Sequence, residues 1–576
     1  MYLRRCSPAK SKKERVYWEL VESYRTERGP RQRVISYLGD ADEPTRLGVK
    51  HAALDLNGTF QRDFFDESAE PDWVEVDTKR VRVERVRDFG GAWLGLAVWD
   101  KLGLSSFLDR VMPQGREGIP WSLMAKVSVL MRLCEPSSEL RIAQDLYARS
   151  SLPDIVGIAP EKVNDDRLYR TMDNLLGHKS ELEKHLKERL GELFDLEYDL
   201  LLYDITSTYF EGEGNDNELA ARGYSRDHRP DCKQVCIALV VSRWGLPLGY
   251  EVFRGNRADV TTVEEVVEKV EGRYGEANRI WVMDRGMVSE ENLKFLRTKK
   301  RKYIVGTAKS QLKRFERQLL AEDWQKVREG LEVKLCAGED GEETFILCRS
   351  AARSQKEKAI HERFERHIEQ GLNKLRESCL QRKQKVGAVE RRVGRLLGAN
   401  SRAAGLFNVE VRTRQDGGAE LVWGKVETWR QWATLSEGCY LLRSNVNDWN
   451  AEQLWQAYMQ LTEAEAAFRV QKDDLRIRPI WHQKSERVEG HILICFLAYV
   501  LWKTIGQICR AAGLGDEPRR VFDEIAQIKV VDVVLPTRKG TEIRRRCISL
   551  PTAPQAALLD KLGLRLPKHL KITQQM

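Results

Sequence analysis

The chain has 576 residues, too many for one hydrophobic core, so we expect several domains. Hydrophobic residues make up 42% and charged residues 32% of the sequence, as in a soluble globular protein. The net charge of +9 is compatible with nucleic-acid binding but does not establish it. The excess is uneven, because ten Lys or Arg fall within the first 33 residues.

The 11 cysteines are scattered and include no Cys-x-x-Cys pair, so we expect reduced thiols and a cytoplasmic location. His228, Cys232 and Cys236 are four residues apart and could form a metal clip. A structural zinc would need a fourth ligand, which disfavours that interpretation. The N-terminus lacks the apolar core of a signal peptide, and the longest apolar run, 492–502, is too short to span a bilayer. We therefore expect a buried helix there and no membrane partner.

The N-terminal region begins with two extended segments, 16–21 and 33–38, joined by a basic turn that contains Gly29 and Pro30. This pattern predicts a β-hairpin whose loop either contacts phosphates or is simply solvated. From residue 90 to 197 apolar residues recur at helical steps, which predicts a helical domain. Five arginines of that region could face DNA, although the interleaved acids favour a solvated surface: Arg132, Arg141, Arg149, Arg167 and Arg170.

A different pattern begins at residue 198. The apolar run 200–203 delivers Asp204 into a polar stretch, as at the end of a buried strand. Residues 234–243 and 248–253 read as a hairpin, and a helix follows Thr262. A second apolar strand, 279–283, delivers Asp284. Ser289 then caps a helix over 290–299, and 303–306 is a further strand.

Residues 307–449 interrupt this rhythm and are interpreted as an insertion. It combines strand-like segments at 331–335, 344–348, 407–412, 419–423 and 439–443 with a long charged helix or helical pair at 356–397. The last 66 residues contain a basic, hairpin-like segment at 533–549.

A helix resumes at residue 451 and carries Tyr458, Leu461, Glu465, Phe468 and Lys472 at steps of 3, 4, 3 and 4, so we expect them to share one face. Glu465 would then lie on a stripe with Leu461 and Phe468, where an unpartnered carboxylate is costly. Either a metal ion or a salt bridge would remove that cost.

Two aspartates that follow predicted strands, 80 residues apart, and a helical glutamate beyond an insertion resemble the layout of the ribonuclease H-like fold. In that layout the acids converge although they are distant in sequence. Two Mg²⁺ ions about 4 Å apart then activate the attacking oxygen and stabilise the leaving one. Carboxylate ligands suit Mg²⁺ or Mn²⁺ better than zinc.

Three segments resemble bacterial insertion-sequence transposases, namely YDITSTYFEG (203–212), GYSRDHRPD (223–231) and MDRGM (283–287). The resemblance is to the DDE branch named after insertion sequence 4, and within it to the subgroup named after insertion sequence 1634. It extends from the N-terminal hairpin through IRPI (477–480) to the tail GLRLP (563–567).

The family surrounds its catalytic glutamate with a Tyr-Arg-Glu-Lys pattern, with spacers of two, three and six residues. The pattern maps onto Tyr458, Leu461, Glu465 and Lys472. Leu461 occupies the arginine position, which is a departure from the family. The spacing selects Glu465 over Glu463 as the third acid.

The resemblance implies that Asp204, Asp284 and Glu465 bind two metal ions, Mg²⁺ or Mn²⁺, and that Tyr458 and Lys472 contact DNA phosphates near the cleaved end. Further expected DNA contacts are Arg469, His228 and Arg229, although a salt network within the surface loop is the alternative for the last two. The implied reaction is nicking at terminal inverted repeats, followed by attack of the freed 3′-hydroxyl on target DNA. Implied partners are double-stranded DNA and a second copy in a synaptic homodimer, with the insertion largely β-rich and in contact with transposon DNA.

We therefore predict a multidomain α/β protein with a ribonuclease H-like core interrupted by a β-rich and helical insertion. Two alternatives stay open: an inactive or domesticated relative that only binds DNA ends, and a metal-dependent nuclease without strand transfer. The predicted boundaries are an N-terminal hairpin and basic region at 1–87, a helical, candidate DNA-binding domain at 88–197, the core at 198–306 and 450–510, the insertion at 307–449, and a C-terminal basic region at 511–576.

Overall fold

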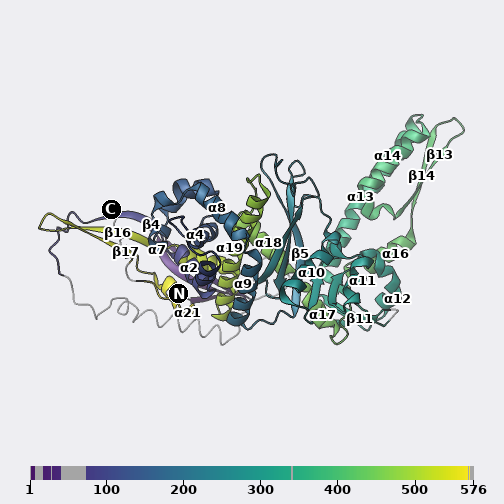
Figure 1. The fold of residues 1–576 in the computed structure, drawn as a ribbon. Helices are drawn as coiled ribbons and strands as arrows, with labels where there is room; N and C mark the ends of the chain where they lie inside the picture. Colours follow the sequence, from purple (N-terminus) through teal and green to yellow (C-terminus); the bar gives the residue numbers. More distant parts are fainter. Residues whose placement is uncertain are drawn as a thin grey trace.

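The computed structural model describes residues 2–6, 17–26, 29–39, 73–338, 341–567 and 570. Along its long axis it contains a helical part, a central sheet with helices on both faces, and an arm that projects from the far end of the sheet (Figure 1). The predicted mixture of helices and strands is therefore confirmed.

The central sheet has nine strands in the order β10-β11-β12-β15-β9-β8-β5-β6-β7. β5, β8 and β9 are parallel to one another, and the other neighbouring strands are antiparallel. The strands are β5 (Leu200–Tyr209), β6 (Gln234–Ser242), β7 (Pro247–Arg254), β8 (Ile280–Met283), β9 (Lys302–Gly306), β10 (Gln325–Arg328), β11 (Leu331–Ala337), β12 (Thr344–Ser350) and β15 (Cys439–Ser444).

Both faces of this sheet are covered, which explains why its central strands read as nearly continuous apolar runs. Successive β5 side chains point to opposite faces. Leu201 and Tyr203 pack with the helices α10 (Val263–Tyr274) and α11 (Glu290–Thr298). Leu200 and Leu202 belong to the core that continues into the helical part.

The helical region predicted from residue 90 is confirmed. Its helices are α2 (Gly90–Lys101), α3 (Leu104–Val111), α4 (Trp121–Cys134), α5 (Glu139–Arg141), α6 (Tyr147–Arg149), α7 (Leu152–Val156), α8 (Asp165–Leu176) and α9 (Lys179–Phe194). From the C-terminal third, α19 (Ser485–Ala511) packs against α4 and α8, and α20 (Pro518–Ala526) and α21 (Ala553–Lys561) follow. By length and composition α19 could cross a membrane, but 89% of its most apolar window is buried inside the protein. It is a core helix, as predicted.

Two small antiparallel sheets involve the ends of the chain. The predicted N-terminal hairpin is confirmed as β2 (Tyr17–Thr26) and β3 (Gly29–Gly39), beside β1 (Tyr2–Cys6). Part of its basic turn, 27–28, lies outside the described residues. The predicted C-terminal hairpin is β16 (Lys529–Pro536) and β17 (Glu542–Ile548), and β4 (Arg82–Asp88) adds a third strand to it.

The segment expected to be an insertion divides into two structural units. Its strands β10, β11, β12 and β15 extend the central sheet, with α12 (Glu316–Leu320) alongside. The remainder forms the projecting arm of Figure 1, which has its own small core. The arm consists of α13 (Ala351–Gln381), α14 (Val386–Ala399), α15 (Ser401–Ala404), the hairpin β13 (Phe407–Thr413) and β14 (Ala419–Lys425), and α16 (Glu427–Ser436).

Candidate active site

Asp204 and Asp284 occupy matching positions on neighbouring parallel strands. Tyr203 of β5 lies opposite Met283 of β8. The residue after each of them is an aspartate, so Asp204 and Asp284 hold equivalent positions on the two strands. Asp284 comes directly after the end of β8, as predicted. Asp204 is the fifth of ten residues in β5, so the prediction that it ends its strand is wrong. The polar residues after it continue to pair with β6, and the β-branched side chains among them suit a strand.

Glu465 lies on α18 (Thr462–Arg469), which packs against β5 and β6. The expected single helix is broken, because α17 (Ala451–Met459) ends before Leu461 and a π-helical turn (Val470–Asp474) follows α18. Leu461 and Phe468 are buried, whereas Glu465 is exposed. The prediction of a common buried stripe is therefore wrong, and the cost of burial does not by itself select Glu465.

The three carboxylates influence one another electrostatically. The pKa of Asp204 is raised to about 7, mainly because the side chain is desolvated, and the negative charges of Glu465 and Asp284 add to the effect. The backbone N–H of Ile205 donates to Asp204 at 2.8 Å, and Arg226 also favours its charged form. The structure thus brings the three acids into one neighbourhood, where their negative charge is only partly compensated.

Tyr458 also reaches this neighbourhood. Its hydroxyl donates to Asp284 Oδ1 at 3.3 Å, and burial raises the pKa of the phenol. Asp284, Tyr458, Leu461 and Glu465 line a cavity of about 430 Å³. The same cavity is lined by four cationic residues, namely Arg285, Lys309, Arg328 and Arg353. A larger cavity of about 1490 Å³ lies in the helical part and includes none of the three acids.

The donor set fits a hard divalent cation. Asp204, Asp284 and Glu465 offer only carboxylate oxygens, the ligands that Mg²⁺ and Mn²⁺ prefer. Burial, with smaller contributions from the charges of Glu465 and Asp284, raises the pKa of Asp204, and a bound cation would favour its charged form. Among the described residues, the metal-type ligands whose atoms all lie within 4.8 Å of one another are Glu139, His482 and His491, and the three acids do not lie that close together.

That second group already has a counter-charge. The Arg132 guanidinium lies 3.4 Å from Glu139 Oε1 and 3.5 Å from His491 Nδ1. Its positive charge already compensates Glu139, and we interpret the group as a buried polar network that joins α4 to α19.

Comparison with known proteins identifies the chain. The profile of the transposase DDE domain family matches residues 195–501, more than half of the sequence. The profile of the IS1634 family transposase N-terminal domain matches residues 3–65. The chain belongs to the IS1634 family of DDE transposases. It is therefore a DNA transposase, an enzyme class that uses divalent metal ions.

Other comparisons add little to this assignment. A cryo-EM structure of a piggyBac transposase synaptic complex with hairpin DNA matches 79% of the transposase and 82% of its own chain, at 9% identity and a TM-score of 0.35. No curated protein sequence matches the chain.

The transposase's expected DNA contacts differ in how accessible they are. Arg469 is exposed, and His228 is exposed in a left-handed backbone conformation with φ 57°. Arg229 pairs with Asp231 at 2.9 Å and with Glu211 at 3.3 Å, which matches the alternative of a salt network within the loop.

Lys472, like Arg229, is already paired with an acid. Its side chain is 11% exposed, and its Nζ donates to Asp227 Oδ1 at 2.8 Å. Asp227 lies in the segment 223–231, which resembles the family, but the sequence pattern predicts no role for it. A signal was present, since one acid among three basic or imidazole side chains in SRDHR suggests a local charge pair.

The alternative metal clip does not form a compact group. Cys236 is buried in β6, and Cys232 contacts Arg229 and Asp231 instead. Within the described residues these side chains are not grouped with His228 as metal ligands.

Proposed function

We propose that this transposase cleaves DNA at transposon terminal inverted repeats and joins the freed 3′-hydroxyl to target DNA, with Asp204, Asp284 and Glu465 as the catalytic metal ligands. The observation that carries the proposal is the shared neighbourhood of these three acids on β5, β8 and α18. The two alternatives require less. A nuclease would cleave the DNA without strand transfer, and an end-binding relative would neither cleave nor join it.

The strand order supports a ribonuclease H-like core. β5, β6 and β7 form an antiparallel meander, and β8 and β9 add in parallel on the other side of β5. Asp204 and Asp284 each follow a residue of the pair Tyr203 and Met283, which supports their assignment to one site. We propose that the core comprises 198–306 and 450–510 and is extended by the four strands of the inserted segment.

Two Mg²⁺ or Mn²⁺ ions, when bound, would supply activation of the attacking oxygen and stabilisation of the leaving one. Asp204, Asp284 and Glu465 would hold them, and Tyr458 would orient Asp284 through its hydrogen bond. The cations that line the adjacent cavity, among them Arg285 and Arg328, would neutralise backbone phosphates.

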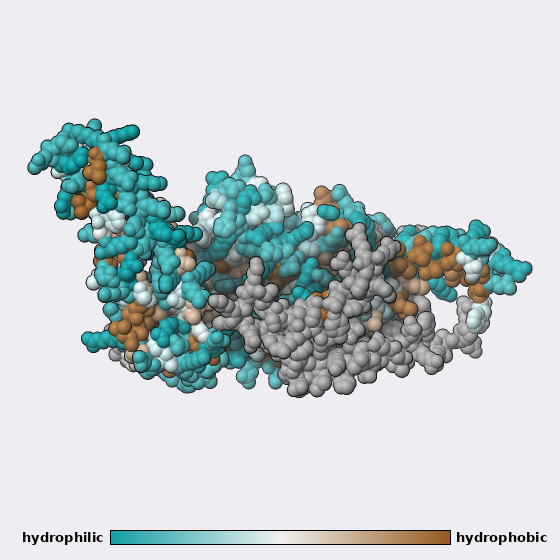
Figure 2. Space-filling view, turned by 180° about the vertical axis from the view of Figure 1, so that it is seen from behind, coloured by the Kyte–Doolittle hydropathy of each residue, from teal (hydrophilic) through white to brown (hydrophobic). Residues whose placement is uncertain are grey.

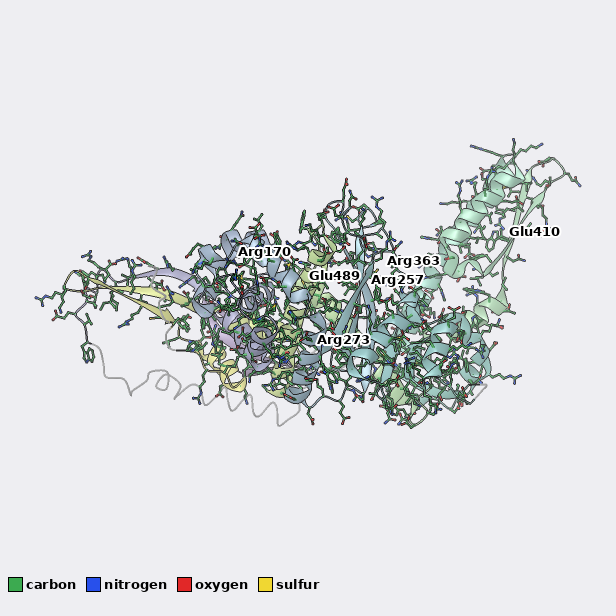
Figure 3. All side chains as sticks on the ribbon, in the orientation of Figure 1. Arg170, Arg257, Arg273, Arg363, Glu410 and Glu489 are labelled. Carbon is green, nitrogen blue, oxygen red and sulfur yellow. The ribbon has the colours of Figure 1, made fainter. Side chains whose placement is uncertain are left out.

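The arm is the strongest candidate for a DNA-binding element outside the core. Residues 351–436 contain 18 Lys and Arg against 10 Asp and Glu, so the arm has a net charge of +8. Its surface is mostly hydrophilic (Figure 2), and Arg363 and Glu410 lie along it (Figure 3). Phosphate neutralisation by such a surface gives sequence-independent affinity. We propose that it binds transposon DNA, and that two copies of the chain hold two ends in the synaptic complex.

An end-cleavage assay tests the proposal. Asp204→Ala should abolish metal-dependent cleavage of a duplex carrying the element's terminal repeat and leave binding of that duplex largely intact. Retained cutting would remove Asp204 from the site, and binding without cutting by the wild type would favour a DNA-binding relative.

A further inference from the structure

Asp227 is a buried carboxylate in the segment between β5 and β6, and it pairs with two cations from a distant part of the chain. Its side chain is 2% exposed. Its Oδ1 accepts a hydrogen bond from Lys472 Nζ at 2.8 Å and also contacts the guanidinium of Arg478. Because a buried carboxylate is costly without such partners, Asp227 fixes where both cations lie.

Both cations have hydrogen-bond donors to spare. A lysine ammonium has three N–H groups and an arginine guanidinium five. The second contact of Arg478 is with Asp473 at 3.0 Å, an acid that is 59% exposed and therefore screened by water. Burial lowers the pKa of Lys472 despite its bond to Asp227, so a further anion would be favourable there.

The cation pair is tied to the elements that carry the catalytic acids. Lys472 follows Glu465 by seven residues, a rise of about 10 Å for helical backbone. On the other side, Arg226, the neighbour of Asp227, interacts electrostatically with Asp204, and its backbone N–H donates to Ser207 Oγ of β5 at 3.2 Å. An anion bound by Lys472 would thus lie close to, but not at, the proposed cleavage site.

We infer that Asp227 is a positioning residue that holds Lys472 and Arg478 as one binding site for a single backbone phosphate of the DNA end. The inference rests on the proposed function, which brings a phosphodiester chain past the three acids. Arginine forks and lysine ammonium groups are the side chains that bind phosphate best. Arg478, which sequence reasoning did not single out, then shares with Lys472 the phosphate contact expected of Lys472 alone.

Asp227→Asn tests the inference because it preserves side-chain shape and removes the charge. The variant gains one net positive charge and loosens both cations. We therefore expect it to bind the terminal-repeat duplex at least as tightly as the wild type. We expect its single-turnover cleavage to be roughly 10- to 100-fold slower, as for other misplaced groups near a reacting centre. Adding Asp227→Asn to the double variant Lys472→Gln/Arg478→Gln should slow cleavage no further, because Asp227 acts through those two residues.

Asp473→Asn is the matched control, since it removes an exposed acid from the same arginine and should leave cleavage unchanged. Wild-type cleavage by Asp227→Asn would overturn the inference. A joint loss of cleavage, DNA binding and thermal stability would instead be a folding defect, and the salt dependence of binding then decides.

A binding measurement separates this inference from the proposed reaction. In Lys472→Gln/Arg478→Gln, the slope of log affinity against log salt should become shallower by about 0.9, the value for one lost phosphate contact. The slope can be measured even if the wild type cuts no DNA, or if Asp227→Asn does not fold. An unchanged slope would show that no phosphate binds there.

Discussion

At the scale of single residues, the proposed site includes Asp204, a carboxylate whose burial disfavours its charged form. Asp204 pairs with Leu239 of β6, and Tyr203 before it pairs with Met283 of β8, so the strand position of Asp204 is fixed beside Asp284. The sequence predicted these three acids from spacing and family resemblance. It could not predict that β5 continues past Asp204, or that Glu465 is exposed, because both depend on which elements pack together.

The raised pKa of Asp204 has a consequence for stability in the absence of metal. Because the folded-state pKa of about 7 exceeds the ordinary value of 3.8, this group favours folding most at low pH, and that contribution is lost as the pH rises from about 4 through 7. In EDTA at pH 8, Asp204→Asn should therefore unfold at higher urea than the wild type, with a gain of about 1–4 kcal/mol. At pH 4 the two proteins should be nearly equally stable. An equal difference at both pH values would contradict the pKa shift.

At the scale of elements, helices and hairpins were predictable because local periodicity, caps and turns encode them. Ser289 caps α11 through Asn292 N–H at 3.1 Å, as its sequence position indicated. The pairing of β12 with β15 was not predictable, since almost ninety residues of arm separate the two strands and no local pattern records which strand is the partner. For the same reason the inserted strands were assigned to a separate unit instead of the central sheet.

The arm's role can be tested through its exposed arginines. Replacing Arg391, Arg392 and Arg395 of α14 by Ala should weaken end binding, and should make the slope of log affinity against log salt shallower by up to about 2.7, because up to three phosphate contacts are lost. Fluorescence anisotropy at several salt concentrations measures this slope.

The control for that experiment removes exposed arginines elsewhere. Arg149→Ala and Arg170→Ala act on side chains that are 73% and 63% exposed and each paired with an acid one helical turn away. The slope should stay unchanged in the control. Equal effects in both sets would mean that net charge, and not the arm, sets the affinity.

The joint between α2 and α20 requires a glycine. A Cβ at Gly90 would lie 1.8 Å from the Ile525 carbonyl oxygen, so the two backbones could not approach as they do. Gly90→Ala should lower stability by several kcal/mol, the range for forced overpacking or local rearrangement. Gly272→Ala in α10 is the control, because nothing lies within 4 Å of the added carbon and alanine favours helix by about 0.5–1 kcal/mol. Denaturant unfolding of both variants checks the contrast, which a tolerated Gly90→Ala would contradict.

At the scale of the whole molecule, three parts lie along one axis (Figure 1). They are a helical part built around α19, the sheet that holds the acids, and a basic arm beyond the sheet. Residues 82–88 and 529–548 pair in the β4-β16-β17 sheet, so the helical part is assembled from segments that precede and follow the central sheet in sequence. The modest overall charge of +9 does not reveal the basic arm, because it is a sum over the acidic and basic stretches of the whole chain. Composition alone could not reveal it, since only the fold shows that residues 351–436 project together.

The central claim is that Glu465 completes a metal site with Asp204 and Asp284. The most direct measurement is Mg²⁺-dependent cleavage of a labelled terminal-repeat duplex by the wild type, Glu465→Gln and Glu463→Gln. Glu463 lies on the same helix and pairs with Lys503 at 2.6 Å, so it controls for loss of a carboxylate from α18. We predict cutting at the repeat boundary by the wild type and Glu463→Gln, and none by Glu465→Gln. Equal cutting by Glu465→Gln and the wild type would show that another residue is the third ligand.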